Sequence, residues 1–166
     1  RPCASRACRP DHKPDMKLVI QRVRRASVQV EGVTLASIGR GLLILCGVAR
    51  GDTEEDARYL ARKTQQLRIF DDAQGRMNLA PGEVEAAFLV VSQFTLYGEC
   101  GNGNRPSYLE AAPPEEGEQG YEQYVLALRE LGVAVQTGKF RAMMEVELVN
   151  DGPVTLILES RGRTSP

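Results

Sequence analysis

Two short polar segments hold the residues best suited to chemistry in this sequence. The first contains Ser92, Gln93, Phe94 and Thr95; it follows an apolar run that is typical of a buried strand and lies just before a glycine. Backbone N–H groups at such a strand end can leave the sheet ladder and stabilise a developing oxyanion. The Thr95 hydroxyl would then be a nucleophile or a positioning group. Because such segments are common in sheets, they could equally be outward residues of an edge strand.

The second segment, residues 150–155, places Gly152 and Pro153 between two apolar stretches. Asp-Gly-Pro is ordinary turn chemistry, and X-Pro bonds are cis in only about 5–6% of folded cases. The local sequence therefore leaves open both the isomer of this peptide and its role.

The scarcity of histidine narrows the possible chemistry. The single histidine, His12, lies in a polar leader, so the body cannot form a Ser-His-Asp or Cys-His site. The sequence also lacks the His-Glu-x-x-His, Gly-x-x-x-x-Gly-Lys and Gly-x-Ser-x-Gly patterns. We therefore expect no metal and no other cofactor. An enzyme built on this chain would use backbone amides, hydroxyls, carboxylates and groups that its substrate brings.

Length and composition predict one domain over residues 16–160, preceded by a disordered leader at 1–15 and followed by a polar tail at 161–166. The four cysteines form no disulfide framework, which favours a reducing, cytoplasmic location. No apolar run approaches the ~20 residues that a bilayer requires, so we expect no membrane insertion.

The charge balance limits how the protein could hold a nucleic acid. The whole chain carries a formal charge of −1, but residues 16–160 contain 15 basic and 20 acidic side chains, a net charge of about −5. Proteins that hold long stretches of nucleic acid usually present a basic face. Any RNA contact is therefore expected to be local, such as the end of a strand, and no DNA partner is expected.

Hydrophobic periodicity predicts an α+β fold with mostly antiparallel strands and two main helices. Strands at 18–23, 26–30 and 33–38 suggest a meander, and the unbroken apolar run at 42–48 suggests a strand covered on both faces. Asp52 is the expected N-cap of a helix at about 53–66. The remaining expectations are a short strand at 87–93, a helix from Pro113-Pro114 to Gly132, and a hairpin of strands 144–148 and 154–158 that turns at 151–153.

Considered together, several segments resemble the D-aminoacyl-tRNA deacylase family, of the type first called D-tyrosyl-tRNA deacylase. The resemblance runs from Met16 to about Ser160, and it departs from the usual pattern at residues 140–144 and in loop 99–104, which lacks the customary basic residues. The segments that carry it are Gln21-Arg22-Val23, Ala26-Ser27-Val28, the turn from Asp72 to Asn78, residues 92–96, Arg105-Pro106-Ser107, Gly138-Lys139-Phe140 and residues 150–155.

The resemblance implies a homodimer of a small β-barrel-like fold. Its pocket lies at the dimer interface and receives the 3′ aminoacyl-adenosine of tRNA. A cis Gly152-Pro153 peptide reaches across from the partner subunit, and its carbonyls meet the substrate's α-amino group, so that an L side chain is refused. Many D-amino acids, and glycine as well, would enter such a pocket.

By the same resemblance, Ser92, Gln93, Phe94 and Thr95 line the reacting ester, and the Phe94 amide donates to the oxyanion. Phe140, Met144 and Ala112 shape the adenosine pocket. Thr95 is one possible nucleophile; the other view has the 2′-OH of the terminal ribose activating the attacking water. The absence of a histidine favours the second view, because a threonine without a base is a poor nucleophile near neutral pH.

The function implied is hydrolysis of D-aminoacyl-tRNA, which recycles mischarged tRNA and enforces homochirality. Two alternatives stay open: a non-catalytic RNA-binding module, and an editing domain of the synthetase type that removes a mischarged L-amino acid. The sequence leaves open which D-amino acids and tRNAs are preferred.

Overall fold

The computed structural model describes residues 15–160. The expected leader and the expected tail at 161–166 lie outside this range, apart from Asp15 at the leader's end. Asp15 is buried, and its carbonyl accepts a hydrogen bond of 2.6 Å from the Tyr97 hydroxyl. Met16 is also fully buried, and its amide donates to the Asp52 carboxylate at 3.1 Å. The packed part of the chain therefore already includes Asp15.

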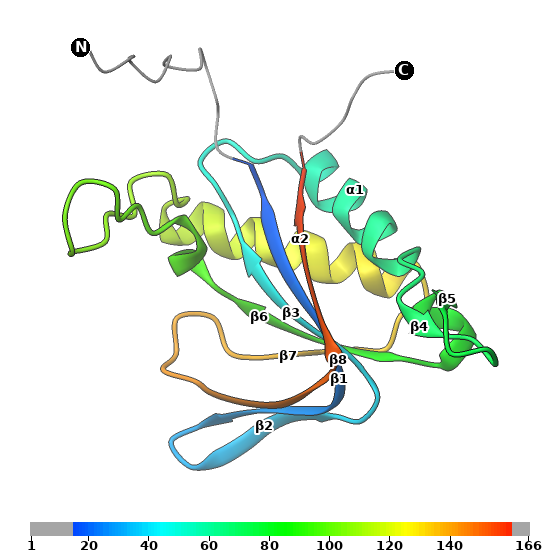
Figure 1. The fold of residues 1–166 in the computed structure, drawn as a ribbon. Coiled ribbons are helices and arrows are strands. Elements are labelled where there is room, and N and C mark those ends of the chain that lie inside the picture. The colour runs from blue at the N-terminus through cyan, green and yellow to red at the C-terminus, as the bar shows by residue number, and fades with distance from the viewer. Residues whose placement is uncertain (1–14, 161–166) are drawn as a thin grey trace, which may run out of the picture.

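A six-stranded mixed sheet forms the framework, with the order β2-β1-β3-β6-β7 and with β8 also paired to β1. The pairs made by β1 are antiparallel, whereas β3 with β6 and β6 with β7 are parallel. The long β1 pairs with three strands along its length, so the sheet curls into a nearly closed, barrel-like shape (Figure 1). The strands are β1 (Lys17–Val30), β2 (Val33–Ile38), β3 (Gly41–Gly47), β6 (Ala87–Ser92), β7 (Val135–Thr137) and β8 (Glu145–Glu159).

The predicted α+β class is confirmed, but the expected meander and strand boundaries are partly wrong. Residues 18–23 and 26–30 form one strand, β1, and β3 returns to pair with β1 instead of following β2. Strand order depends on contacts between distant segments, which local periodicity does not encode. A separate hairpin is formed by β4 (Phe70–Asp71) and β5 (Met77–Leu79) around the predicted polar turn.

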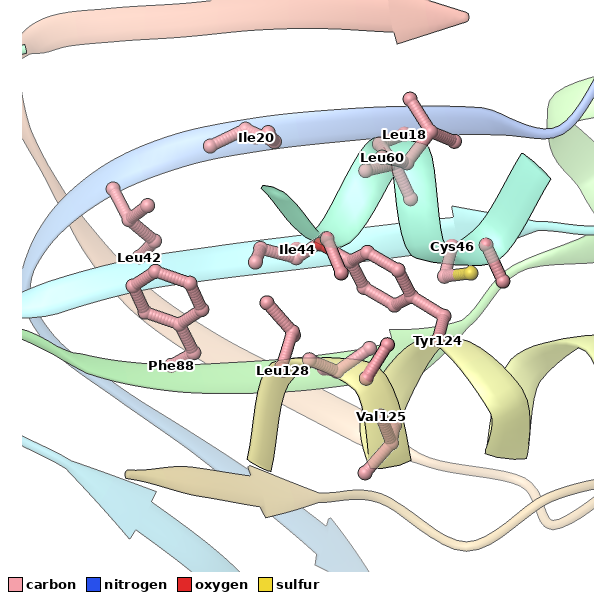
Figure 2. Packing of buried hydrophobic residues seen from close by; sticks show 14 of the residues in the cluster. Leu18, Ile20, Leu42, Ile44, Cys46, Leu60, Phe88, Tyr124, Val125 and Leu128 are labelled. Carbon is pink, nitrogen blue, oxygen red and sulfur yellow. The ribbon is translucent and has the colours of Figure 1, made fainter. Parts of the chain in front are cut away.

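Two helices, α1 (Glu54–Gln65) and α2 (Pro114–Glu130), lie on one face of the sheet (Figure 1). Leu60 of α1 and Tyr124 of α2 point toward Ile44 of the central strand β3 in the main core (Figure 2). The Tyr124 hydroxyl lies 3.0 Å from the Thr64 hydroxyl, which joins the two helices inside the core. No helix in the range 15–160 is long and apolar enough to cross a membrane.

The strands β3 and β6 are buried on both faces, as their unbroken apolar sequences predict. One face packs under the helices, while the other faces a second cluster inside the curled sheet that includes Leu43, Leu89 and Val91. The two strands can therefore hold the segments that follow them in fixed positions.

The start of α1 differs from the sequence prediction by one residue. Thr53 is the N-cap: its hydroxyl accepts from the Asp56 amide, and the Asp56 carboxylate accepts from the Thr53 amide. Asp52, the expected cap, instead accepts from the amides of Ala49 and Met16 at 2.6 and 3.1 Å. The Asp52 carboxylate therefore joins the loop before α1 to Met16, the residue that precedes β1.

The expected hairpin at the end of the chain is wrong, because β8 is one continuous strand. Both of its halves pair with β1: Leu148 lies opposite Ala26, and Leu158 lies opposite Leu18. The register jumps between them, from Gln21 opposite Thr155 to Val23 opposite Asn150. Residues 151–154 therefore form a bulge in β8 opposite Arg22, and the Asp-Gly-Pro sequence marks that bulge instead of a turn.

Candidate active site

A cavity of about 660 Å³ brings together most of the residues singled out from the sequence. It lies between the end of β6, the residues before α2 and the segment that links β7 to β8. Three stretches far apart in the chain therefore meet at one hollow. The sequence-predicted residues that line it are Ser92, Gln93, Phe94, Ala112, Phe140 and Met144.

The segment after β6 presents unused backbone donors. The Gln93 amide still bonds to the Cys46 carbonyl at 2.9 Å, but the chain then leaves the sheet and forms the 3-10 helix η2 (Phe94–Tyr97). Within residues 15–160, the amides of Phe94 and Thr95 donate no backbone hydrogen bond. Two consecutive N–H groups beside the cavity are thus without a backbone acceptor, and free backbone donors of this kind can stabilise an oxyanion.

Tyr97 and Gly47 hold this segment against the end of β3. The Tyr97 hydroxyl donates to the carbonyl of Gly47, 2.9 Å away, as well as to that of Asp15. A Cβ atom at Gly47 would lie 2.9 Å from the Tyr97 ring and 3.2 Å from the Gln93 carbonyl oxygen. Only glycine allows this close approach. Sequence reasoning missed both residues; the available signal was a glycine at the end of a buried strand.

Thr95 lies beside the cavity and is not one of the residues that line it. Its hydroxyl accepts a hydrogen bond from the side-chain amide of Gln93. An amide cannot take up the hydroxyl proton, and no carboxylate in residues 15–160 hydrogen-bonds to this hydroxyl. The local chemistry therefore does not activate Thr95 as a nucleophile.

The far wall of the cavity is held to the sheet and to α2. The Phe140 ring lies 6.1 Å from the Tyr121 ring, and the Tyr121 hydroxyl donates to the Val90 carbonyl of β6 at 2.8 Å. The Gly138 amide donates to the same carbonyl at 3.2 Å, and the Ala112 amide bonds to the Val48 carbonyl at 2.9 Å. These contacts fix the apolar wall relative to the backbone donors of η2.

Gly152 and Pro153 lie elsewhere, in the β8 bulge. The peptide bond between them is cis; both residues are exposed, and neither lines the cavity of its own chain. The Arg22 guanidinium holds the bulge from β1, with Nε 3.3 Å from both the carbonyl and the carboxylate of Asp151. The Asn150 side-chain amide spans the base of the bulge, donating to the carbonyls of Arg22 at 3.0 Å and Val154 at 3.1 Å.

Three buried groups near the cavity, the Cys46 thiol and the Tyr97 and Tyr121 hydroxyls, are kept in their neutral forms. Burial, followed by the charge of Asp52, raises the pKa of the Cys46 thiol well above its usual range. Burial likewise raises the pKa values of the Tyr97 and Tyr121 hydroxyls. None of these groups supplies an anionic nucleophile near neutral pH. In the described range, no three His, Cys, Asp or Glu residues gather as a metal site would require.

Solved structures of other proteins share this α+β architecture of a curled mixed sheet with two helices on one face. One is the c-Myc DNA unwinding element binding protein, with a TM-score of 0.81 and 39% identity over 87% of this chain and 98% of that one. Another, titled a probable eukaryotic D-amino acid tRNA deacylase, has a TM-score of 0.76 over the same shares of the two chains. At 16% identity, the second supports the fold alone.

The sequence comparisons then give the family. The model of the D-Tyr-tRNA(Tyr) deacylase family matches residues 19–159, and the chain belongs to this family. A D-aminoacyl-tRNA deacylase from Anaeromyxobacter dehalogenans is 58% identical over 88% of this chain and 98% of the relative. One from Geobacter sulfurreducens is 55% identical over 90% of this chain and 99% of the relative. The resemblance inferred from the motifs is thereby confirmed.

Proposed function

We propose that this protein hydrolyses the ester that joins a D-amino acid to the 3′-terminal adenosine of tRNA. The reaction returns the tRNA for correct charging and keeps D-residues out of new proteins. Family membership supports this activity, and one structural observation carries its assignment to a site. Six residues that were selected from three distant sequence segments line a single cavity, and two unused backbone amides lie beside it.

In the proposed reaction, a water oxygen attacks the ester carbonyl and the bond to the ribose 3′-oxygen breaks. The amides of Phe94 and Thr95 stabilise the negative charge on the carbonyl oxygen, and each such donor contributes about 10²–10³-fold in rate. The 2′-OH of the same ribose orients and activates the water. The products are the free D-amino acid and a 3′-OH that receives the proton lost by the water.

The side chains around the amides have positioning roles in this proposal. Ser92 and Gln93 line the ester, and Gln93 also holds the Thr95 hydroxyl through their hydrogen bond. Phe140, Met144 and Ala112 receive the adenosine. A largely apolar wall with few polar groups suits a nucleobase. The substrate's hydroxyl takes the place of the base that the site lacks, since it is already adjacent to the ester.

We further propose that two copies complete each site, with Gly152 and Pro153 entering the cavity of the partner. Three features support this arrangement: both residues are exposed, they do not line their own cavity, and β8 pairs only with β1 among residues 15–160, which leaves its other edge unpaired within that range. Ile157, which is 66% exposed on the same strand, gives this edge an apolar side chain for a second copy to cover.

The backbone carbonyls of the partner's bulge would accept from the α-amino group of the substrate. They would leave space on the D side of the α-carbon and none on the L side, so selection depends on exclusion. Glycine, which has no side chain, is expected to be hydrolysed as well. A cytoplasmic location accords with this substrate and with the free thiols of Cys46 and Cys100.

Other functions make different demands on the molecule. An RNA-binding module needs no oxyanion donors, and a DNA-binding role needs a basic face that the acidic body does not provide. A multiple-turnover assay decides between binding and catalysis. With D-tyrosyl-tRNA in 100-fold excess, we expect release of many equivalents of D-tyrosine per subunit. Binding without release supports an RNA-binding module, and faster release of L-serine from mischarged tRNA supports a synthetase-type editing domain.

A further inference from the structure

The charged residues around the cavity are all of one sign. Of the 18 residues within the described range 15–160 that line it, the only charged ones are Arg50 and Arg141, and none is a carboxylate. This contrasts with the acidic body of the chain, which carries about −5 over residues 16–160. The two arginines favour a negatively charged group on the ligand, and the largely apolar lining favours an apolar part beside it.

Arg50 is held in place by only part of its guanidinium group. Its Nε donates to the Leu109 carbonyl at 2.9 Å, and its backbone amide donates to the Glu110 carbonyl at 3.2 Å. In residues 15–160, its two terminal amino groups form no hydrogen bond or ion pair. The guanidinium is therefore fixed through Nε, and its two terminal amino groups can still donate to a ligand. A planar guanidinium can donate to two oxygens of one phosphate group at once.

Arg141 reaches the cavity from the segment between β7 and β8. Its φ of +64° is a left-handed conformation that is uncommon for a residue other than glycine, and the turn is closed by the Ala142 amide donating to the Lys139 carbonyl at 3.2 Å. The Arg141 guanidinium has no ion-pair partner within the described range. Such backbone outliers concentrate at ligand-binding positions.

A neighbouring hollow of about 440 Å³ defines how far a polyanion could extend. It shares Val48 and Arg50 with the cavity, but it is also lined by Asp52, Glu54 and Glu116. These carboxylates oppose the passage of a nucleic-acid backbone on that side. The surroundings thus suit a single phosphate group at the cavity and not a long track of phosphates.

We propose that Arg50 and Arg141 together bind the phosphodiester on the 5′ side of the terminal adenosine of tRNA. This inference rests on the proposed function and adds a phosphate subsite to the same cavity. With the adenosine against the apolar wall, the phosphate is the nearest negative charge of the substrate. Such a subsite would position the 3′ end of the tRNA in the cavity through one phosphate contact, so the acidic protein would need no extended basic face.

The test compares two small substrates that differ in one phosphodiester. They are the 3′-O-D-tyrosyl esters of adenosine and of adenosine 5′-(methyl phosphate). The readout is the ratio of their kcat/KM values, which cancels any general effect of a substitution on folding or on the shared chemistry. We expect the wild-type protein to favour the phosphate-bearing ester by about tenfold or more, as charge-assisted hydrogen bonds would give.

The variants Arg50→Gln and Arg141→Gln are each expected to lower this ratio severalfold, and the double variant should bring it close to one. Arg62→Gln, which removes an exposed arginine of α1 outside the cavity, should keep the wild-type ratio. With whole D-tyrosyl-tRNA, the slope of log kcat/KM against log salt should also become shallower by about one unit in the double variant.

Two results would overturn the inference. A wild-type ratio near one shows that the phosphate is not recognised, and an unchanged high ratio in the double variant shows that other residues recognise it. If the protein hydrolyses neither of the two esters nor D-tyrosyl-tRNA, the proposed function is overturned, and the phosphate subsite with it. Hydrolysis of both esters at equal rates removes the subsite alone.

Discussion

Arg22 on β1 binds Asp151 on β8 twice, with Nε 3.3 Å from both the backbone carbonyl and the side-chain carboxylate. The Arg22 side chain is only 6% exposed, and its Nη1 also donates to the Ile69 carbonyl at 2.6 Å. One buried guanidinium therefore joins three segments and fixes the bulge that presents Gly152 and Pro153. Because the acceptors lie in different directions, the shorter, single-point ammonium of lysine cannot replace it.

Arg22→Lys is expected to lower the free energy of unfolding by about 2 kcal/mol. The substitution leaves the Ile69 carbonyl and the Asp151 carbonyl and carboxylate without their charged donor. It should also reduce kcat/KM on D-tyrosyl-tRNA at least tenfold, since the bulge loses its anchor. Chemical denaturation and a deacylation assay measure the two effects. Arg24→Gln is the matched control: Arg24 pairs with the same Asp151 at 3.6 Å but is 76% exposed, so its loss should matter little. Equal effects of the two substitutions would contradict the anchoring role.

Gly152→Ala tests the bulge itself. The residue has a φ of +124°, and a Cβ atom there would lie 2.8 Å from the Val154 side chain and 2.9 Å from the Val154 amide nitrogen. We expect a loss of about 1–3 kcal/mol in stability and a large loss of activity. Gly32→Ala is the control, because its φ of +78° is also left-handed while the space around it is open. Comparable loss of activity in both variants would argue against a specific role for Gly152.

Mixed dimers extend this test to the proposed sharing of sites. A dimer of one Gly152→Ala subunit and one Phe140→Ala subunit contains one site with an intact bulge and an intact cavity wall, if the bulge enters the partner's cavity. The mixture should then be more active than either variant alone. Activity no higher than the average of the two parents would place the bulge and the cavity within one subunit.

Gly47→Ala should displace the backbone amides of η2 without removing any functional group. Its Cβ would meet the Tyr97 ring at 2.9 Å, so the segment from Gln93 to Tyr97 must shift. Overpacking of this kind costs about 1–3 kcal/mol, and we expect kcat to fall at least tenfold with a smaller change in KM. Steady-state kinetics test this, with Gly39→Ala, which has open space for a methyl group, as the control. A Gly47→Ala variant with the wild-type kcat would show that catalysis does not depend on the position in which Gly47 and Tyr97 hold the η2 amides.

The identity of the activating group is tested by a pair of changes, one in the protein and one in the substrate. Thr95→Ala should keep activity within about tenfold, because the Thr95 hydroxyl is bound to an amide and has no base to activate it. A tRNA that ends in 2′-deoxyadenosine should be hydrolysed at least 100-fold more slowly, since the proposed activating hydroxyl is missing. The opposite pattern, with an inactive Thr95→Ala and normal hydrolysis of the deoxy substrate, would reverse the two roles.

The sequence predicted the local elements of this fold better than their pairing. The apolar run before Gly47 and the helical spacing after Thr53 indicated β3 and α1 to within a few residues. The final hairpin failed because Asp-Gly-Pro suits a tight turn and a strand bulge equally well. Only the long β1, which offers partners to both halves of β8, decides between them.

The resemblance assigned roles to the cavity residues but none to Arg22 and Tyr97, which hold the bulge and the η2 segment in place. Ser92 and Phe140 belong to recognisable segments, so their meeting at one cavity could be anticipated. Arg22 and Tyr97 act by reaching carbonyls 129 and 50 residues away in the chain. A single sequence contains no local signal for contacts at such separations, because they exist only once the sheet has curled.

Stereochemistry gives the most direct test of the proposed activity. The same tRNA is charged with D-tyrosine or L-tyrosine, and release of each amino acid by the wild-type protein is followed under identical conditions. We expect kcat/KM for the D-ester to exceed that for the L-ester by at least 10³-fold, because exclusion by a rigid backbone discriminates more strongly than a change in apolar contact, which gives about 10–200-fold. Equal hydrolysis of the two esters, or preference for the L-ester, would contradict the proposal that this protein is a chiral deacylase.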